Sequence, residues 1–298
     1  MKVLVIGATG YLGSVITEGL VARGHKVTAF VRSPRALPRG IDQHVGDLGD
    51  ADSVRAAVKP DIDAVVHAAT PLGDWDAERR SVRAAVDALG SAAKRFVYVS
   101  GVWVLGSSVR SDGSVQVHDE ASPPDPIALM AGREGLEEDV LTGRAHGIVV
   151  RPGVLHGRGG GIPAMVQRWA ADEGQGVYVG DDDQVTWATV HVEDAADLVT
   201  LALEKGERGR ILHAVAENAV PSRLIASAAA ESAGLEGRTR RRTPLEAAGD
   251  VGVAFADALA LSQRVESTAA RALGWRPTRP GILTDLRTGS YARAGSIA

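Results

Sequence analysis

Three glycines, at positions 7, 10 and 13, carry the clearest chemical signal in this sequence. They follow a short apolar run, Val3 to Ile6, and they open a segment of helical periodicity. A buried strand, a glycine turn and a helix N-terminus form a binding site for a diphosphate, because free backbone N–H groups and the positive end of the helix point at the phosphates. The sequence therefore predicts that the chain binds a dinucleotide.

The residues after the second expected strand bear on which dinucleotide binds. NAD sites usually have a carboxylate there, about 20 residues beyond the glycines, to bind the ribose 2′-hydroxyl. Here the segment reads Arg32-Ser-Pro-Arg35, without a carboxylate, and a guanidinium can pair with a 2′-phosphate. We expect NADP(H), with NAD(H) the less favoured ligand; the alternative is that Arg32 is a solvated charge. Asp47, after the third strand, either accepts from the adenine amino group or caps a turn.

Strand and helix patterns alternate along the first half of the chain. Short runs rich in Val, Ile or Phe predict strands, and helical patterns lie between them, which indicates a parallel sheet with right-handed crossovers. The expected strands are 2–6, 26–31, 43–46, 62–67, 95–99 and 147–151, and the expected helices are 11–23, 50–58, 77–93 and 127–142.

Beyond Pro152 the pattern becomes less regular. The expected elements there are helices at 163–172 and 193–204 and strands at 186–191 and 210–214, before a mainly helical, alanine-rich remainder. We expect a doubly wound, Rossmann-like α/β fold with a smaller, mainly helical C-terminal lobe. In this division residues 1–154 form the dinucleotide-binding domain and 186–214 return to it. Residues 155–185 and 215–298 form the substrate-binding lobe.

Charge and composition exclude several classes of protein. The 298 residues carry a formal net charge of −4 at pH 7 and include no cysteine. This slightly negative charge does not indicate binding to nucleic acid, which requires a basic surface. Without thiolates or histidines at zinc spacing we expect no metal site, and no apolar stretch approaches the length of a membrane span. We expect a cytoplasmic protein that acts on a small molecule and binds neither nucleic acid nor membrane.

Motifs along nearly the whole chain resemble the short-chain dehydrogenase/reductase superfamily, in its extended and atypical branches of epimerase/dehydratase-like proteins. Gly7 to Gly13 is similar to the phosphate loop of that family. The other matching motifs are Gly46-Asp47-Leu48 for the adenine, Val65 to Thr70 for the fourth strand beside the cofactor, Phe96 to Gly106 for the fifth strand and active-site loop, and Arg151 to Gly157 for the segment flanking the nicotinamide.

The resemblance also implies a set of cofactor contacts. With the residues discussed above, the predicted cofactor-binding residues are Gly7, Thr9, Gly10, Tyr11, Leu12, Arg32, Asp47, Leu48, Ala68, Ala69, Thr70, Pro152 and Val154. Members of the family are often dimers, so the resemblance leaves a homodimer open.

The chain departs from the family at the catalytic centre. The family uses a Tyr as general acid/base and, four residues later, a Lys that lowers the pKa of the Tyr. None of the tyrosines here is followed by such a lysine. The corresponding helix places Met130 at the Tyr position and Glu134 at the Lys position, and a shift of one residue gives Leu129 and Arg133. Ordinary Tyr-based carbonyl reduction is therefore not expected.

Three other side chains are candidates for the reacting centre. Ser100 ends the fifth strand, where its hydroxyl either touches substrate or nicotinamide or caps the next turn. Arg133 either holds an anionic group of the substrate or is a solvated helix charge, and it cannot shuttle protons. His156 is either a replacement acid or a loop histidine with satisfied hydrogen bonds.

These residues leave three functions open. The first, which we favour, is an NADP(H)-dependent oxidoreductase that transfers a hydride to a small, hydrophobic carbonyl, imine or alkene without the Tyr–Lys pair. The second is a cofactor-bound enzyme of non-redox type, such as an isomerase, cyclase or epimerase. The third is a regulatory protein that senses NADP(H). Four aromatic residues (Trp75, Trp103, Tyr178 and Trp187) either line a pocket for a bulky apolar substrate or pack the lobe.

Overall fold

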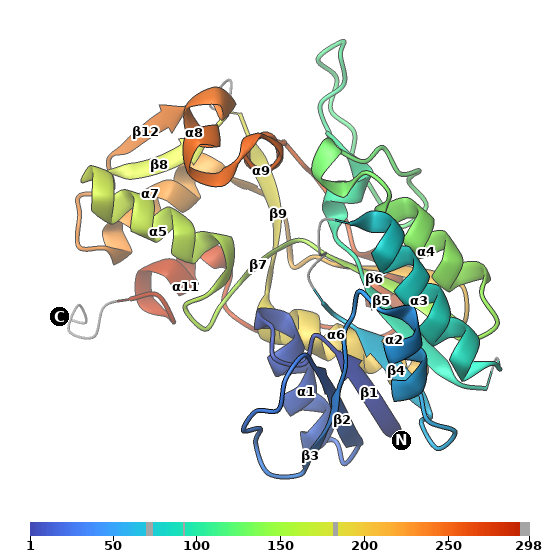
Figure 1. The fold of residues 1–298 in the computed structure, drawn as a ribbon. Coiled ribbons are helices and arrows are strands. Elements are labelled where there is room, and N and C mark those ends of the chain that lie inside the picture. Colours follow the sequence, from blue (N-terminus) through green and yellow to red (C-terminus); the bar gives the residue numbers. More distant parts are fainter. Residues whose placement is uncertain (70–73, 92, 181–183, 293–298) are drawn as a thin grey trace.

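A seven-stranded parallel sheet forms the centre of the computed structural model, which describes residues 1–69, 74–91, 93–180 and 184–292 (Figure 1). The strand order is β10-β6-β5-β4-β1-β2-β3. The bounds are β1 (Lys2–Ile6), β2 (Lys26–Val31), β3 (Ile41–Val45), β4 (Ala64–His67), β5 (Arg95–Val99), β6 (His146–Pro152) and β10 (Arg210–Ala214). This arrangement confirms the predicted Rossmann-like α/β fold.

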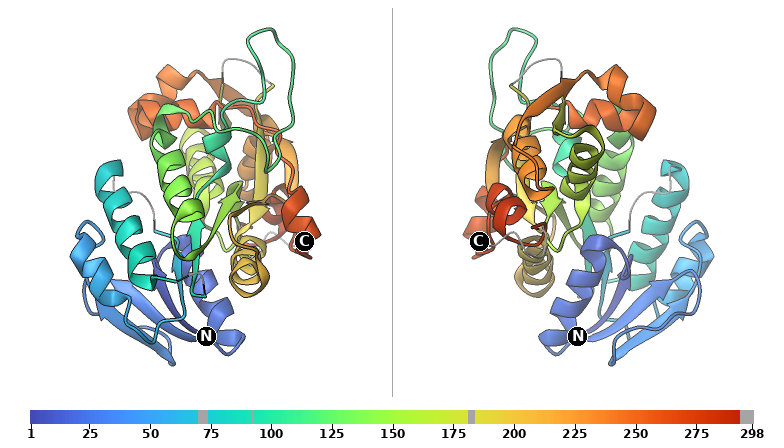
Figure 2. Two further views of the ribbon diagram at one scale, coloured as in Figure 1. Left: turned by 90° about the vertical axis from the view of Figure 1, so that its right-hand side faces the viewer. Right: turned by 90° about the vertical axis from the view of Figure 1, so that its left-hand side faces the viewer.

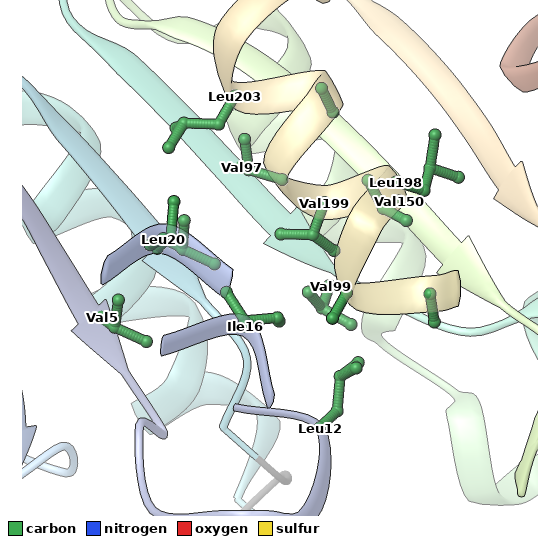
Figure 3. Close-up of a cluster of buried hydrophobic side chains, with 14 of the residues drawn as sticks. Val5, Leu12, Ile16, Leu20, Val97, Val99, Val150, Leu198, Val199 and Leu203 are labelled. Carbon is green, nitrogen blue, oxygen red and sulfur yellow. The ribbon is translucent and has the colours of Figure 1, made fainter. Parts of the chain in front are cut away.

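Helices cover both faces of the sheet, which explains why its central strands are apolar on both sides. One face packs against α1 (Tyr11–Ala22) and α6 (Val192–Lys205). Figure 3 shows this cluster, in which Ile16 and Leu20 of α1 meet Val199 of α6 above the strands. The other face packs against α2 (Ala51–Ala57), α3 (Trp75–Leu89) and α4 (Arg133–Thr142).

The remaining elements form a smaller part with two short sheets. One sheet has the order β11-β9-β7, and the other pairs β12 with β8. The strands are β7 (Val154–His156), β8 (Gly176–Val179), β9 (Thr186–His191), β11 (Glu217–Pro221) and β12 (Thr239–Arg242). The helices are α5 (Gly161–Glu173), α7 (Ser222–Ser232), α8 (Pro244–Val251), α9 (Val253–Leu259) and α11 (Ile282–Thr288). The short helix α10 (Thr268–Ala272) packs instead against β10 of the large sheet. In the side views of Figure 2 the N-terminal strands (blue) and the segment near residue 250 (orange) lie at opposite ends of the molecule.

Two of the sites where the chain passes between the two parts lie side by side. Pro152 at the end of β6 is in register with Ala214 at the end of β10. The N–H of Gly153 donates to the carbonyl of Ala214 at 3.0 Å. Residues 210–214 thus belong to the large sheet, whereas β9 belongs to the sheet of the smaller part. None of the described helices has the length and apolar character to cross a bilayer.

The helix expected at 127–142 is shorter than predicted. A 3₁₀ turn, η2 (Ala128–Met130), comes first, and α4 begins only at Arg133. Gly132 separates them with a φ of +99°, and a Cβ there would lie 3.1 Å from Cγ of Trp75. Glycine adopts this conformation at low cost, and its missing side chain leaves room for the indole. The helix therefore begins after Gly132.

Candidate cofactor and substrate site

The glycine loop between β1 and α1 has the shape of a diphosphate cradle. Gly7 has a φ of +85°, and a Cβ there would lie 2.6 Å from the backbone nitrogen of Ala69. A Cβ on Gly13 would overlap the Gly7 carbonyl. Gly10 precedes α1 in an extended conformation without a side-chain cap, so N–H groups of the first helical turn keep no intrahelical acceptor. These residues fit the dinucleotide that the sequence predicts.

A cleft of about 830 Å³ extends from this loop across the ends of the strands. The predicted cofactor-binding residues that line it are Gly7, Thr9, Gly10, Tyr11, Leu12, Arg32, Asp47, Leu48, Ala68, Ala69 and Pro152. Thr70 lies outside the described residues. Val154 lines the adjoining cavity instead.

The end of the cleft beside β2 and β3 is basic. Arg32 and Arg35 line it after β2, and Asp47 lines it after β3. One oxygen of Asp47 accepts from the N–H of Gly49 at 2.9 Å, while the N–H of Asp47 donates to Ser53. Asp47 therefore shapes its own turn and also faces the cleft. The sequence did not single out Ser33, which also lines the cleft.

A second cavity, of about 660 Å³, adjoins the first. Both are lined by Tyr11, Ser100, Arg133, Pro152 and Leu155. The other lining residues of the second cavity are Trp75, Gly101, Val102, Trp103, Ala128, Leu129, Met130, Gly153, Val154, Gly161, Ile162, Ala254 and Phe255. Within this described lining Arg133 is the one charged residue. Trp75 and Trp103 thus face the cavity, whereas Tyr178 and Trp187 belong to the core of the smaller part.

Arg133 lies at the junction of the two cavities, between aromatic rings. Its Cζ is 5.6 Å from the ring centroid of Trp75 and 5.5 Å from that of Tyr98. The residue is 5% exposed, and its Nε has no hydrogen-bond partner within the described part of the chain. The nearest anion is Glu78 of α3, with 4.0 Å between Nη2 and Oε1. The sequence predicts Arg133 as a site residue, and the structure places it where the two cavities meet.

Glu78 belongs to a buried group that the sequence did not single out. The Tyr98 hydroxyl donates to its Oε1 at 3.2 Å. Burial raises the pKa of Glu78, against the opposing effects of Arg133 and Tyr98. Burial and the charge of Arg133 lower the pKa of nearby His67 to about 3. The sequence does contain one sign that Glu78 is buried. It lies four residues before the apolar Val82, so both residues share the buried face of α3.

Ser100 is also at the junction. It follows β5, it is buried, and its Oγ has no partner among the described residues. Its backbone N–H donates to the Val150 carbonyl at 2.8 Å, which fixes its position beside β6. A buried hydroxyl without a partner is costly, so a ligand atom in the cleft would satisfy it.

His156 does not reach either cavity, so its geometry does not support the predicted role of replacement acid. Its ring is buried, with Nδ1 3.2 Å from Oδ2 of Asp285 on α11. The ring also meets His191 edge-on at 5.2 Å between centroids. Leu155 lines the cleft, and His156 faces the interior of the smaller part.

Comparisons with known proteins bear on the family of the chain. The model of the NAD dependent epimerase/dehydratase family matches residues 3–215. A 3-diazoavenalumate denitrifying reductase from Streptomyces sp. is 28% identical, over 94% of this chain and 97% of its own length.

Two solved structures share the fold. The human epimerase family protein SDR39U1 with NADPH superimposes with a TM-score of 0.76 at 23% identity, covering 97% of this chain and 99% of that one. The UDP-glucose 4-epimerase of Thermus thermophilus with NAD also gives 0.76, at 20% identity, covering 98% and 99%. The family match confirms the resemblance seen in the motifs. The chain belongs to the NAD dependent epimerase/dehydratase family, with a fold of the extended short-chain dehydrogenase type.

Proposed function

We propose that this protein is an NADP(H)-dependent oxidoreductase that reduces a small hydrophobic molecule without a Tyr–Lys pair. One observation carries the proposal. A dinucleotide cleft opens into an apolar cavity whose described lining contains no Lys, His, Asp or Glu. Tyr11 is its one phenol, and the hydroxyl of Tyr11 donates to the carbonyl of Gly157 at 2.6 Å. Burial also raises the pKa of Tyr11, which makes it a poor acid.

The choice of NADP(H) rests on the basic end of the cleft. Arg32 and Arg35 line it where an NAD site usually has a carboxylate after the second strand. Guanidinium groups pair well with phosphate oxygens. The human protein of the same fold holds NADPH, whereas the Thermus epimerase holds NAD. The fold therefore does not distinguish the two cofactors, and the choice of NADP(H) rests on the two arginines.

The lining favours reduction over epimerisation of a nucleotide sugar. A sugar diphosphate has many polar groups, and burying them without partners costs about 1–3 kcal/mol each. The second cavity offers them few partners, whereas it matches an apolar substrate. The Streptomyces relative of similar length is a reductase by name.

The chain's own residues position the substrate and stabilise charge. When bound, a reduced nicotinamide supplies two electrons and one hydrogen to an electrophilic carbon. The Ser100 hydroxyl donates to the substrate atom that becomes electron-rich, and the positive Arg133 favours negative charge beside it. Met130, Trp103 and Phe255 exclude water from the apolar side. Since the lining offers no proton donor of suitable pKa, the second hydrogen comes from solvent as a proton.

The test measures cofactor consumption and the fate of the transferred atom. NADPH deuterated at C4 is mixed with a panel of hydrophobic ketones, imines and conjugated alkenes. We expect NADPH oxidation, deuterium in the product, and a rate that changes less than about threefold from pH 6 to pH 8.5, because no side chain of the described lining titrates there. The variant Ser100→Ala should lower kcat by about tenfold or more.

The other two functions give different results. A non-redox enzyme would convert substrate without net NADPH oxidation. A sensor would bind NADP⁺ and NADPH with different affinities and show no turnover, since a ligand shifts an equilibrium only by differential binding. Either result would replace the proposal.

A further inference from the structure

We infer that the substrate is an apolar molecule with a single anionic group, most simply a carboxylate, and that Arg133 binds this group. The inference deepens the proposed function and rests on it for the chemical step after binding. Binding itself can be measured without turnover. The inference starts from the guanidinium, which lines both cavities and whose Nε has no hydrogen-bond partner within the described residues.

A buried guanidinium whose Nε has no partner is a costly group. Arginine has five N–H donors, and a buried donor left without an acceptor loses its hydrogen bonds to water without replacement. The rings of Trp75 and Tyr98 flank the cation and hold it by cation–π contacts. These contacts fix its position but leave its N–H donors free. A planar anion in the junction would accept two of them at once.

Glu78 is too far away to be the full partner. Its Oε1 is 4.0 Å from Nη2 of Arg133, beyond hydrogen-bond distance, and it accepts instead from Tyr98. Its Oε2 has no partner among the described residues. Burial raises the pKa of Glu78, while the charge of Arg133 and the Tyr98 hydroxyl oppose the rise. Glu78 therefore offsets part of the charge of Arg133 but accepts no hydrogen bond from it.

The cavity limits the ligand to one charge. Arg133 lies at one side of it, and the remaining described walls are uncharged, with Val102, Leu129 and Ile162 among them. A second charge on the ligand would lose its water without gaining a partner. An alkyl or aryl acid fits these walls, because its apolar body fills the cavity while its carboxylate stays at the junction.

The test compares acids with their neutral amides. Binding of octanoate and 4-phenylbutanoate, each against its primary amide, is measured by calorimetry on the full chain, with and without NADP⁺. We expect each acid to bind at least about tenfold more tightly than its amide. In Arg133→Met the binding affinity should fall roughly 30-fold or more for the acids and less than threefold for the amides. The reason is that removing one partner of a buried charge pair costs about 2–5 kcal/mol. Arg83→Gln, which removes an exposed arginine on α3, should change neither.

A second variant keeps the test decisive if Arg133→Met does not fold. Glu78→Gln removes the competing anion and keeps the side chain's shape. We expect this variant to bind the acids several-fold more tightly and the amides with unchanged affinity. If Glu78 and Arg133 have only a structural role, the variant should bind the acids more weakly or not at all.

Two results would overturn the inference. One is equal binding of acids and amides by the unchanged protein. The other is an Arg133→Met protein that keeps its preference for acids but loses affinity for NADP⁺, which would assign Arg133 to the cofactor. NADPH oxidation with a neutral substrate would then leave the proposed function standing.

Discussion

Met130 and Glu134 stand four residues apart in the sequence but lie on two different elements. Met130 ends the turn η2, and Glu134 lies in the first turn of α4, beyond Gly132. The side chain of Met130 lines the apolar cavity, while Oε2 of Glu134 accepts from the N–H of Gly132 at 3.0 Å. Side chains four residues apart share a face only on a continuous helix. The chain therefore lacks both the residue types of the family pair and the helical turn that aligns them.

The interruption of the helix at Gly132 predicts what happens when the Tyr–Lys pair of the family is introduced. In the double variant Met130→Tyr/Glu134→Lys we expect the new ammonium to lie away from the phenol, because Gly132 still interrupts the helix. Ketone reduction should rise by less than about tenfold, against the 10²–10⁴-fold that a positioned acid contributes. A hundredfold gain in kcat/KM would contradict this account.

The basic end of the cleft predicts the effect of Arg32→Asp. The new carboxylate removes a partner of the 2′-phosphate and adds a like charge, while it can accept from the 2′-hydroxyl of NAD. Hydrogen bonds to charged groups contribute about 1.5–3 kcal/mol, so we expect NADP(H) to bind roughly 10- to 100-fold more weakly. NAD(H) should bind equally or better. Fluorescence titration of both reduced cofactors measures this, and unchanged affinities would show that Arg32 does not bind the phosphate.

His67 predicts a dependence of stability on pH. It is fully buried, and its folded-state pKa of about 3 lies below the unfolded value of 6.5. Between these values the unfolded chain binds a proton that the folded chain does not, so stability is lost as the pH falls below 6.5. At pH 5 the loss from this residue is about 2 kcal/mol.

Urea unfolding at pH 7 and pH 5 tests this. The variant His67→Leu should lose about 2 kcal/mol less between the two pH values than the unchanged protein does. His44→Gln, on the edge strand β3, should keep most of the original loss. If His67→Leu shows the same loss as the unchanged protein, then His67 is not the titrating group.

The buried pair of Glu137 and Arg151 predicts a strong loss of stability when one partner is removed. Nε of Arg151 lies 3.0 Å from Oε1 of Glu137, and both side chains are almost fully buried. We expect Glu137→Leu to lower the free energy of unfolding by about 3–5 kcal/mol, because it leaves a buried charge. Adding Arg151→Met should recover most of this loss. Arg83→Gln, which breaks an exposed pair, should cost less than about 1 kcal/mol.

The large sheet could be predicted because most of its strands are local apolar runs; the exception is the edge strand β3, which reads Ile-Asp-Gln-His-Val. Strands of three to five residues in the smaller part, such as β7 and β12, carry no such run and went unpredicted. His156 shows the same limit at the site. Its motif places it beside the cofactor, but its partner Asp285 is 129 residues away in sequence. Which way a strand residue faces depends on such distant contacts, whereas the glycine loop is formed by neighbouring residues.

The adjacent crossings after Pro152 and Ala214 have a mechanical consequence. The substrate cavity is walled from both sides, by Met130 of the sheet-bearing half and Phe255 of the other. Gly153 is bonded to Ala214 beside these crossings, and the Tyr11 hydroxyl also donates to the Gly157 carbonyl of the other half. Nε2 of Gln263 donates in the same way to the carbonyls of Val102 and Gly106. A movement that separates the halves must break these hydrogen bonds, so a substrate that fits within the existing walls binds at less cost than one that forces them apart.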